Sequence, residues 1–496
     1  MLSNPSQTLT ALTIAGSDSS GGAGIQADLA TFANFNVHGL SVITALTAQN
    51  PQGVHRVSLS SIEQITAELN AIEILKPAAI KIGMLANSEI LNSVNQWLNQ
   101  QPVPVVCDPV MSATSGGSLL DNNGIADFKN LLNNITLLTP NIREAEILTG
   151  TNIATVEDIQ LAADNLLAMG ADSVLITGGH FLEESDVCLD YFKNAEQQYW
   201  LRGKRIATVN NHGTGCTLSS AIAAALAHGY ELIDAVVLGK MAVSQGLSQA
   251  QSIGNFTGAV AHPGGPCRIE FLPEILPANA HPLEYKTPAF SRCTTEPLGV
   301  YPVVDSADWV EKCLAEGVPT VQLRVKDLPE DTLRELVKQS VAAQQKYGGQ
   351  LFINDYWQLA IEYGAYGVHL GQEDLDTADI HQIAEAGLRL GVSNHAWYEI
   401  ARAHAIKPSY MAIGPIYSTP TKVMRFAPQG LEQLQEWVDL LKSEYPMTAI
   451  GGINLERAPA VAKSGVGSIA VVRAVTEAAD YKAAINELNN SLQAEL

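Results

Sequence analysis

Charged and amide side chains follow short apolar segments in the second half of the chain. VQLRVK places Gln322, Arg324 and Lys326 at alternate positions, which share one face of an extended strand. Asp355 and Asp374 come after the next two apolar segments, in FINDYWQLA and GVHLGQEDL. Two carboxylates opposite Arg and Lys are the groups that a magnesium diphosphate requires. Taken singly, each is better explained structurally, Asp355 by a helix N-cap and Asp374 by a loop turn.

Further anion ligands follow the later apolar segments. GPIYSTPTK offers Thr419, Thr421 and Lys422, while AIGGIN and SIAVVRAV lie in the last two loops, where (β/α)8 barrels commonly bind phosphate. His369 alternates inward on its strand and is interpreted as a packed core residue rather than a ligand. Because no Ser/His or Cys/His pair is evident, the pattern predicts chemistry without a nucleophilic side chain.

In the first half, AGSDSSGGAGIQAD combines a strand end, a Gly/Ser loop and a helix start. Gly22, Gly24 and Ala27 match the dinucleotide fingerprint GxGxxA, which also needs an acidic residue roughly 20 positions further on. SVITALTAQN falls at that distance and contains no carboxylate, so we reject an NAD site. Taken singly, each glycine is better explained by a tight strand–helix turn.

A second glycine motif of this half is NHGTGCTLSSA. Gly213 and Gly215 permit close backbone approach, and the free N–H groups of the helix that follows form an anion hole. Cys216 lies at that helix start, where the pKa of a thiol is lowered and a thiolate can accept a proton. The alternative is a structural cysteine packed among Ala and Ser, which is the better explanation for an isolated Cys.

Eight β-branched runs in the second half alternate with helix-compatible segments such as 330–346 and 430–444. Eight evenly spaced units over about 200 residues predict a closed (β/α)8 TIM barrel rather than a doubly wound sheet. The runs are 298–304, 320–325, 350–354, 367–370, 389–393, 410–414, 447–451 and 467–472.

The first half alternates LTIAG, SVITAL, AIKIGM, VPVVCD, ITLLTP and SVLITGG with helical segments. This predicts an open, mostly parallel, doubly wound α/β sheet with ligands beyond the carboxyl ends of its strands. Seven of the 23 prolines fall between Pro263 and Pro297, which predicts an extended connector, because proline removes backbone donors and disfavours helix. We therefore expect a first domain at 1–268, a linker at 269–297 and a barrel at 298–496.

The chain has 496 residues and a net charge of −22, so DNA, RNA and anionic lipid are disfavoured as partners. Its six cysteines show no CxxC spacing, which disfavours disulfides and structural zinc and favours a reducing compartment. No signal-peptide pattern is present, and no apolar run approaches the roughly 18 residues of a membrane span. A cytoplasmic protein is expected, and homo-oligomer formation is left open.

Together, the first-half motifs resemble hydroxymethylpyrimidine/phosphomethylpyrimidine kinases of the ribokinase-like superfamily. AGSDSSGGAGIQAD, SVITALTAQN, KIGML, LTPNIREAEIL and NHGTGC occur in the family's order across residues 8–265. The resemblance implies ATP-dependent phosphorylation of the 5-hydroxymethyl group and then of the monophosphate. It places Gly16, Asp28, Gln49 and Met84 in the pyrimidine pocket, Gly213, Gly215 and Cys216 at the anion hole with Cys216 as general base, Asn141 and Glu144 at Mg-ATP, and Lys240 at the triphosphate.

One position of this half departs from the family pattern. Thr177 stands where the family usually carries a Lys, assigned to the transferred phosphate, before the two glycines of VLITGGH. Weaker ATP binding or turnover is therefore implied. Two alternatives remain for this half: a pyridoxal kinase, which shares the fold and an aromatic hydroxymethyl substrate, or a degraded kinase that serves as a pyrimidine-binding regulatory module. Only Thr177 favours the module, and the intact NHGTGC opposes it.

The second-half motifs resemble thiamine-phosphate synthase over residues 298–480. That family condenses hydroxymethylpyrimidine diphosphate with thiazole phosphate, or its carboxylate, and releases diphosphate. Two positions depart from it: Val325, where Glu is frequent, and Arg473, where a small Ser is usual. The resemblance implies pyrimidine diphosphate binding by Gln322, Arg324, Lys326, Asn354, Ser393 and Lys422, Mg²⁺ binding by Asp355 and Asp374, and thiazole phosphate binding by Thr419, Thr421 and Gly452, with phosphate contacts near Val472 and Arg473.

The implied coupling is dissociative. Mg²⁺, Arg324 and Lys422 stabilise the departing diphosphate, and the thiazole nitrogen captures a pyrimidine-methyl cation. Because the product of the first domain is the substrate of the second, we expect a bifunctional thiamine-biosynthesis enzyme that uses ATP and Mg²⁺.

Overall fold

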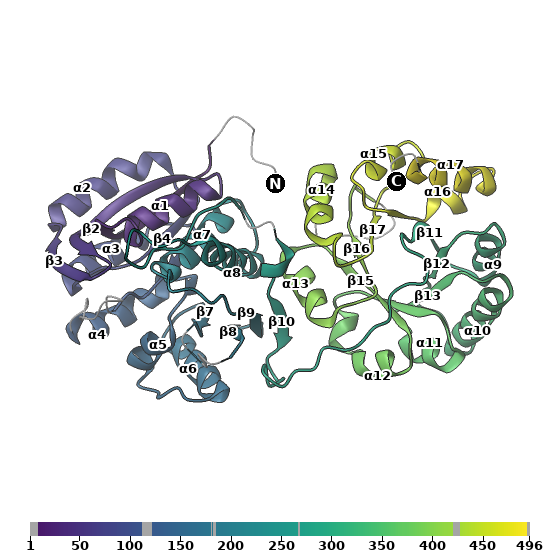
Figure 1. Cartoon of the computed structure of the whole chain (residues 1–496), viewed down its shortest axis with the longest axis horizontal. Helices are drawn as coiled ribbons and strands as arrows, with labels where there is room; N and C mark the ends of the chain where they lie inside the picture. Colours follow the sequence, from purple (N-terminus) through teal and green to yellow (C-terminus); the bar gives the residue numbers. More distant parts are fainter. Residues whose placement is uncertain are drawn as a thin grey trace. The chain divides into compact units, whose positions relative to one another are not determined.

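The computed structural model describes residues 8–111, 122–179, 181, 185–265, 268–419 and 427–493. The chain forms two compact units, which divide between Tyr285 and Lys286 (Figure 1). No helix among these described segments is long and apolar enough to cross a membrane.

Six parallel strands form the centre of the first unit, and they confirm the six apolar runs. β1 lies between β2 and β4, and β5, β6 and β7 follow β4 outward. The strand order therefore reverses at β1, which is the switch point where open α/β sheets bind ligands. The six strands are β1 (Thr10–Asp18), β2 (His38–Asn50), β4 (Ala79–Ile82), β5 (Val105–Cys107), β6 (Leu137–Leu138) and β7 (Ser173–Thr177).

Antiparallel strands extend this sheet at both edges, to ten strands in the described part of the chain. β3 pairs with β2 at one edge, and β8, β9 and β10 continue beyond β7 at the other. These strands were not expected from the sequence. They are β3 (Gly53–Leu59), β8 (Val187–Asn194), β9 (Gln198–Lys204) and β10 (Glu274–Pro277).

Helices cover both faces of the central strands, since every residue of β4 is buried. The helix α7 (Thr214–Ala227) contacts β1, β4 and β5 and packs between α1 and α8, where its Ala and Ser residues permit close approach. The helices of this unit are α1 (Gly24–Asn34), α2 (Ile62–Ile72), α3 (Ser88–Leu98), α4 (Asn122–Leu131), α5 (Ile142–Thr149), α6 (Val156–Ala168), α7 and α8 (Leu232–Gln249).

The second unit is a closed parallel barrel in which β18 pairs with β11, so the predicted TIM barrel is confirmed. Each of the eight predicted runs is a strand, and the helices lie around the outside (Figure 1). The strands are β11 (Gly299–Val304), β12 (Thr320–Leu323), β13 (Gln350–Asn354), β14 (Gly367–Leu370), β15 (Arg389–Asn394), β16 (Tyr410–Ile413), β17 (Met447–Ile450) and β18 (Ser468–Val471). The helices are α9 (Ala307–Ala315), α10 (Glu330–Tyr347), α11 (Trp357–Tyr363), α12 (Ile380–Glu385), α13 (Trp397–Ile406), α14 (Gly430–Leu441), α15 (Ala458–Ala462), α16 (Arg473–Thr476) and α17 (Tyr481–Gln493).

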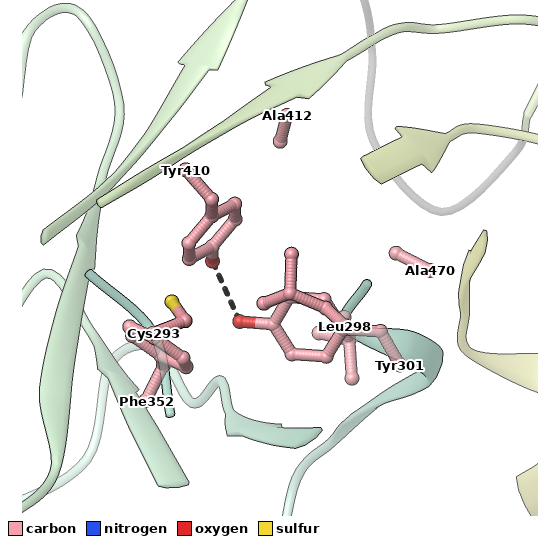
Figure 2. Close-up of a cluster of buried hydrophobic side chains, with 8 residues drawn as sticks. Cys293, Leu298, Tyr301, Phe352, Tyr410, Ala412 and Ala470 are labelled. Atoms are coloured by element: carbon pink, nitrogen blue, oxygen red, sulfur yellow. Dashed lines mark hydrogen bonds between the residues drawn. The ribbon is translucent and has the colours of Figure 1, made fainter. Parts of the chain in front are cut away.

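Aromatic side chains fill the barrel interior. Tyr301, Phe352 and Tyr410 are each at most 1 % exposed and pack with Cys293 and Leu298, as Figure 2 shows. The rings of Phe352 and Tyr410 meet edge to face, with centroids 5.0 Å apart. This geometry is the favourable one for aromatic pairs, and it makes the interior a packed core rather than a pore.

The proline-rich segment differs from the expected free linker, because most of it packs on one unit or the other. β10 pairs with β9 at the edge of the first sheet, and Arg202 donates to Glu274 at 2.6 Å. Residues 291–297 pack on the barrel instead. Ser409 donates from Oγ to the carbonyl of Ser291 at 2.7 Å, and the Thr294 N–H donates to Tyr366 at 2.7 Å. Hydrogen bonds and burial therefore extend both units into the proline-rich segment, past residue 268 on one side and before residue 298 on the other.

The edge strand generates a stability prediction. A fragment 1–268 ends before β10 and loses the burial of Leu272, Ile275 and Leu276, each at most 4 % exposed. We expect it to unfold more easily than a fragment 1–285, by at least about 3 kcal/mol, because each buried aliphatic side chain contributes about 1.5–3 kcal/mol. Urea denaturation of both fragments measures the difference. Equal midpoints and slopes would show that β10 is dispensable.

Candidate active sites

The carboxyl ends of β1, β4 and β5 meet at the switch point of the first sheet. Gly16 and Met84 are adjacent there, since a Cβ on Gly16 would lie 2.9 Å from Met84 Cε. Both residues were predicted to line the pyrimidine pocket, and the fold brings them together. Asp108 follows β5 at the same edge, where a Cβ on Gly215 would lie 3.1 Å from its carboxylate.

Asp18 organises the glycine-rich loop beside this pocket. Its carboxylate accepts hydrogen bonds from Ser20 and from the Ala23 N–H, and it lies 3.0 Å from Nε2 of His212. Gln49, another predicted pocket residue, places Nε2 3.4 Å from the same His212 nitrogen. His212 therefore links the two loops, and neither it nor Asp18 was predicted as a site residue.

Gly213 joins the same loops through its backbone. Its φ of 81° lies in the left-handed region, and a Cβ there would lie 1.9 Å from the carbonyl oxygen of Gly22. Only glycine fits this close approach. Gly213 is the N-cap of α7, so the contact positions the free N–H groups at the start of that helix.

Asp28, which was also predicted to bind the pyrimidine, forms a buried ion pair with Lys81. Both carboxylate oxygens accept from Lys81 Nζ at 2.8 Å, Thr13 donates at 2.6 Å and Ser220 donates at 2.7 Å. Asp28 and Lys81 are fully buried. Burial opposes the charge on Lys81, but the neighbouring carboxylate outweighs it and raises the pKa of Lys81. The carboxylate of Asp28 is thus occupied by protein donors, whereas the sequence analysis expected it to face the substrate.

Asn141 and Glu144 form a capping box at the start of α5. Asn141 accepts from the Glu144 N–H at 3.0 Å, and Glu144 accepts from the Asn141 N–H at 3.0 Å. The NxxE pattern thus has a structural role that the sequence analysis did not assign. Glu144 is 7 % exposed, and burial together with the charge of Asp108 raises its pKa to about 8.

Asp108 is the main residue of this site that the sequence analysis missed. It is 6 % exposed, and burial raises its pKa to about 6 while Lys81 opposes the shift. A carboxylate directly after the predicted strand VPVVC was the available signal. Two buried, mutually repelling carboxylates are stabilised by a cation, and Mg²⁺ typically takes only one or two protein carboxylates. Their chemistry therefore fits Mg²⁺, although no group of three metal-binding side chains occurs in the described segments.

Cys216 occupies the first turn of α7 as predicted, but its electrostatics differ from the prediction. Part of the residue reaches the surface, yet burial of the thiol raises its pKa to about 12, and the Lys81 charge only partly opposes this. The pKa is therefore raised rather than lowered as expected, because desolvation of the thiol outweighs the nearby Lys81 charge. At neutral pH, Cys216 is therefore a thiol.

Lys240 is paired inside the first unit. Its ammonium forms an ion pair with Asp190 and a hydrogen bond with Cys188 Sγ at 3.3 Å, and it is 8 % exposed. Asp190 also accepts from the Gly178 N–H at 3.0 Å. Lys240 thus supports the glycine turn after Thr177 through Asp190, and its charge is already neutralised.

In the barrel, the predicted magnesium ligands lie together at the carboxyl mouth. Asp355 and Asp374 interact directly, and burial plus the charge of Asp374 raises the pKa of Asp355 to about 6. Lys326 Nζ lies 3.8 Å from Asp355 Oδ2, and Arg324 also opposes the shift. Two clustered carboxylates beside two cations fit a Mg²⁺ diphosphate.

The sequence also offered a structural role for each of these carboxylates, a helix N-cap for Asp355 and a loop turn for Asp374. The structure shows only the second of these. The N-cap of α11 is Tyr356, without a side-chain cap bond, so Asp355 does not cap that helix. Asp355 instead has a φ of 66°, a left-handed conformation that is unfavourable for most residues. Asp374 does form the expected turn bond, accepting from the Gly371 N–H at 3.1 Å.

The remaining synthase residues lie around the same mouth where they are described. Gln322 and Asn354 are 4 % and 6 % exposed on neighbouring strands. The loop that carries Thr419 contacts the loop that carries Gly452, through a Tyr417 N–H to Gly451 carbonyl bond of 3.0 Å. Val472 and the exposed Arg473 begin the short helix α16. Thr421 and Lys422 lie outside the described residues.

A Ser/His pair is present in the barrel, contrary to the sequence analysis. His369 Nε2 lies 2.8 Å from Ser393 Oγ, and His369 Nδ1 lies 2.7 Å from the Tyr410 hydroxyl. His369 is 6 % exposed, as expected for a core residue, and burial with the nearby Arg324 lowers its pKa to about 3. The pair was not visible in the sequence, because its members lie 24 positions apart on adjacent strands.

The folds define an open α/β unit and a TIM-barrel unit, each with interacting carboxylates at the carboxyl ends of its parallel strands. A phosphomethylpyrimidine kinase family model matches residues 18–261, and a thiamine monophosphate synthase model matches residues 300–475. The barrel is 55% identical over 195 residues to thiamine-phosphate synthase of Serratia proteamaculans, covering 39% of this chain and 92% of that protein. It is 56% identical over 191 residues to that of Salmonella typhimurium, with 38% and 90% covered.

Solved structures resemble the first unit. Pyridoxal kinase from Staphylococcus aureus in complex with pyridoxal is 32% identical, with a TM-score of 0.50, covering 54% of this chain and 98% of that one. Phosphomethylpyrimidine kinase from Clostridium difficile is 38% identical, with a TM-score of 0.43 and coverage of 48% and 99%. The chain belongs to the thiamine-phosphate synthase family through its barrel, and its first unit is a domain of the phosphomethylpyrimidine kinase type. It is a fused, bifunctional enzyme of thiamine biosynthesis.

The geometry of Asp355 predicts a gain in stability when its charge is removed. Because its folded pKa lies above the ordinary value, the folded barrel loses stability as pH rises from about 4 through 6. Asp355→Asn should therefore stabilise the unliganded barrel at pH 7.5 by about 1–2 kcal/mol, with solvent screening included, and should change little at about pH 4. Urea denaturation, followed through the barrel transition, measures this.

Asp327→Asn is the matched control, because Asp327 is exposed and has a similar φ of 58°. We expect it to leave the stability unchanged within about 0.5 kcal/mol. Destabilisation by Asp355→Asn at pH 7.5 would mean that the carboxylate is a structural turn residue rather than a strained ligand.

Proposed function

We propose that the first unit phosphorylates 4-amino-5-hydroxymethyl-2-methylpyrimidine twice with ATP, and that the barrel couples the resulting diphosphate to thiazole phosphate, or its carboxylate. One observation supports both halves of the proposal. Each unit gathers two interacting carboxylates next to cations at the carboxyl ends of parallel strands, Asp108 with Glu144 and Asp355 with Asp374. Such pairs suit Mg²⁺-bound phosphates.

In the kinase unit, we assign Gly16, Gln49 and Met84 to the pyrimidine and the first turn of α7 to the transferred phosphate. Asp28 acts by holding Lys81, whose charge also acts on Cys216 and Asp108. Asp108 and Glu144 would hold Mg²⁺, which neutralises phosphate charge when bound.

Three further groups complete the kinase assignment. The thiolate fraction of Cys216 accepts the proton of the substrate hydroxyl, so that the oxygen attacks the terminal phosphorus of ATP and ADP leaves. Asn141 orients Glu144 through the capping box. Lys240 supports the turn after Thr177 through Asp190.

In the barrel, we assign Gln322, Asn354 and Ser393 to the pyrimidine, and Arg324, Lys326 and Lys422 to its diphosphate. The C–O bond breaks with its electron pair remaining on diphosphate, and the lone pair of the thiazole nitrogen forms the new C–N bond. Arg324 and Lys326 stabilise the charge that develops on the leaving group. Asp355 and Asp374 would hold Mg²⁺, while Thr419, Thr421, Gly452, Val472 and Arg473 form the thiazole phosphate site.

A second substrate for the kinase unit is favoured by its likeness to the Staphylococcus aureus pyridoxal kinase. Pyridoxal carries a hydroxymethyl group on an aromatic ring, so Cys216 would accept a proton from the same kind of hydroxyl. Competition between the pyrimidine and pyridoxal in one assay gives the ratio of the two kcat/KM values. A ratio in favour of pyridoxal would replace the proposed substrate.

Variants in one unit should leave the reaction of the other unit intact. Cys216→Ala should lower pyrimidine phosphorylation by roughly 10²–10⁴-fold, the usual contribution of a general base, and should leave coupling of supplied pyrimidine diphosphate unchanged. Asp355→Asn and Asp374→Asn should sharply reduce coupling and spare phosphorylation. Each variant is thus the control for the other. Retention of Mg²⁺-dependent coupling by both Asn variants would refute the metal assignment.

The raised pKa of Cys216 predicts how phosphorylation depends on pH. If this thiol is the base, kcat/KM should rise between pH 7 and 9 by close to tenfold per unit, because the thiolate fraction grows up to a pKa of about 12. Cys216→Asp supplies a base that is already ionised at pH 7 and should flatten the profile. A flat profile in the unaltered enzyme would assign the proton to another group, such as Asp108.

A further inference from the structure

A buried chain of hydrogen bonds crosses the barrel interior and connects two residues assigned to the pyrimidine. Gln322 Nε2 donates to the Tyr301 hydroxyl at 3.2 Å, and the Tyr301 and Tyr410 hydroxyls are 2.7 Å apart (Figure 2). Tyr410 lies 2.7 Å from His369 Nδ1, and His369 Nε2 lies 2.8 Å from Ser393 Oγ. We call Tyr301, Tyr410 and His369 the tyrosine–histidine chain.

The tyrosine–histidine chain is rigid, because its members stand on strands and pack in the barrel core. Tyr301 is 1 % exposed, Tyr410 is 0 % exposed and His369 is 6 % exposed. Its three members stand on β11, β16 and β14, and the ring of Phe352 packs against both tyrosines. Ser393 on β15 is only half-buried, so the chain ends where a ligand can reach it.

The donors and acceptors allow one consistent direction through the chain. The Gln322 amide nitrogen only donates, so the Tyr301 hydroxyl oxygen accepts from it. The buried Tyr301 O–H also needs an acceptor, and we therefore assign it as the donor to the Tyr410 oxygen. Tyr410 then donates to Nδ1 of a neutral His369, whose proton must lie on Nε2 and is donated to Ser393.

The direction of these hydrogen bonds fixes which end of the tyrosine–histidine chain donates to a ligand and which end accepts. Ser393 accepts from His369, so its hydroxyl proton is left to point towards a ligand. Gln322 uses its amide nitrogen in the chain, so its amide oxygen is left as the acceptor. An aminopyrimidine presents the matching groups, since its amino group donates and its ring nitrogens accept.

We propose that the tyrosine–histidine chain determines which pyrimidine the barrel couples, by fixing Ser393 as a donor and Gln322 as an acceptor. The inference rests on the proposed coupling reaction and on the assignment of both residues to the pyrimidine. A 4-oxo-pyrimidine presents an oxygen in place of the amino group and an N–H beside it, so both of its groups are mismatched. Buried polar groups left unpaired make such a site strongly selective.

Tyr410→Phe is the decisive variant, because it keeps the packed ring and removes one hydroxyl from the middle of the chain. We expect kcat/KM for the supplied aminopyrimidine diphosphate to fall about 10- to 100-fold while that for the 4-oxo analogue stays constant or rises. Equal losses for both substrates would make the chain a structural element only and overturn the proposal. Phosphorylation by the other unit of the same chain gives the amount of active protein, and the urea transition of the barrel shows whether the barrel of the variant is folded.

Tyr366→Phe is the matched control. Tyr366 also packs edge to face on Phe352, but it bonds to Gln350 and Thr294 rather than to the chain. It should leave the ratio between the two substrates unchanged, even if stability falls. A changed ratio would show that any loss of packing alters selectivity, and would also overturn the proposal.

The tautomer of His369 tests the direction of these hydrogen bonds without an activity assay. Nitrogen-15 NMR of the full chain with labelled histidine, assigned by comparison with His369→Asn, should show His369 neutral with its proton on Nε2 at pH 7. A proton on Nδ1 would reverse the direction and refute the proposal. If the unaltered enzyme couples neither pyrimidine, the proposed function fails while the tautomer still decides whether the chain has this polarity.

Discussion

Parallel strands bring the residues that follow them to one edge of a sheet, and both sites of this protein depend on that constraint. In the first unit, residues separated by up to about two hundred positions meet at the carboxyl edge of β1, β4 and β5. In the barrel, the same geometry places Arg324, Asp355 and Asp374 at one mouth. Charged groups accumulate there because these loop ends remain accessible to a ligand while the strands themselves are buried.

Two arrangements of buried charge occur in this protein: an ion pair whose charges neutralise each other, and pairs of carboxylates that repel each other. Lys81 and Asp28 neutralise each other, with every carboxylate oxygen hydrogen-bonded. Such full satisfaction offsets the desolvation cost of a buried pair. Asp108 with Glu144, and Asp355 with Asp374, instead repel each other, and burial together with this repulsion raises the pKa of Glu144 and of Asp355. These carboxylates are unfavourable in the unliganded protein, as expected for groups that a cation stabilises.

The segment that joins the two units packs partly on the first unit and partly on the second. β10 completes the edge of the first sheet, and residues 291–297 close the amino-terminal end of the barrel. Proline suits both places, because edge strands and irregular segments tolerate its missing N–H. The connector thus contributes to the stability of each unit instead of merely joining them.

The sequence by itself determined the parallel strands of both units, because each is a short apolar run bounded by turn residues, and it determined the glycine motif around Gly213. It also indicated that Asp355 and Asp374 would lie together, because Asp355 comes directly after one such run and Asp374 four residues after the next. Tertiary structure decided the rest. The antiparallel strands are less evident, because β3 is largely exposed and the buried residues of β8 and β9 are accompanied by charged or amide side chains at the strand ends, so their pairing depends on the sheet already formed.

Burial, which a sequence does not display, raised the pKa of Cys216, and it turned Asp28 and Lys240 into paired charges. The Ser393–His369 pair joins residues on adjacent strands, and the pairing of β14 with β15 brings their side chains to hydrogen-bond distance. Sequence patterns report local periodicity, whereas desolvation and contacts between distant residues arise only when the chain has folded.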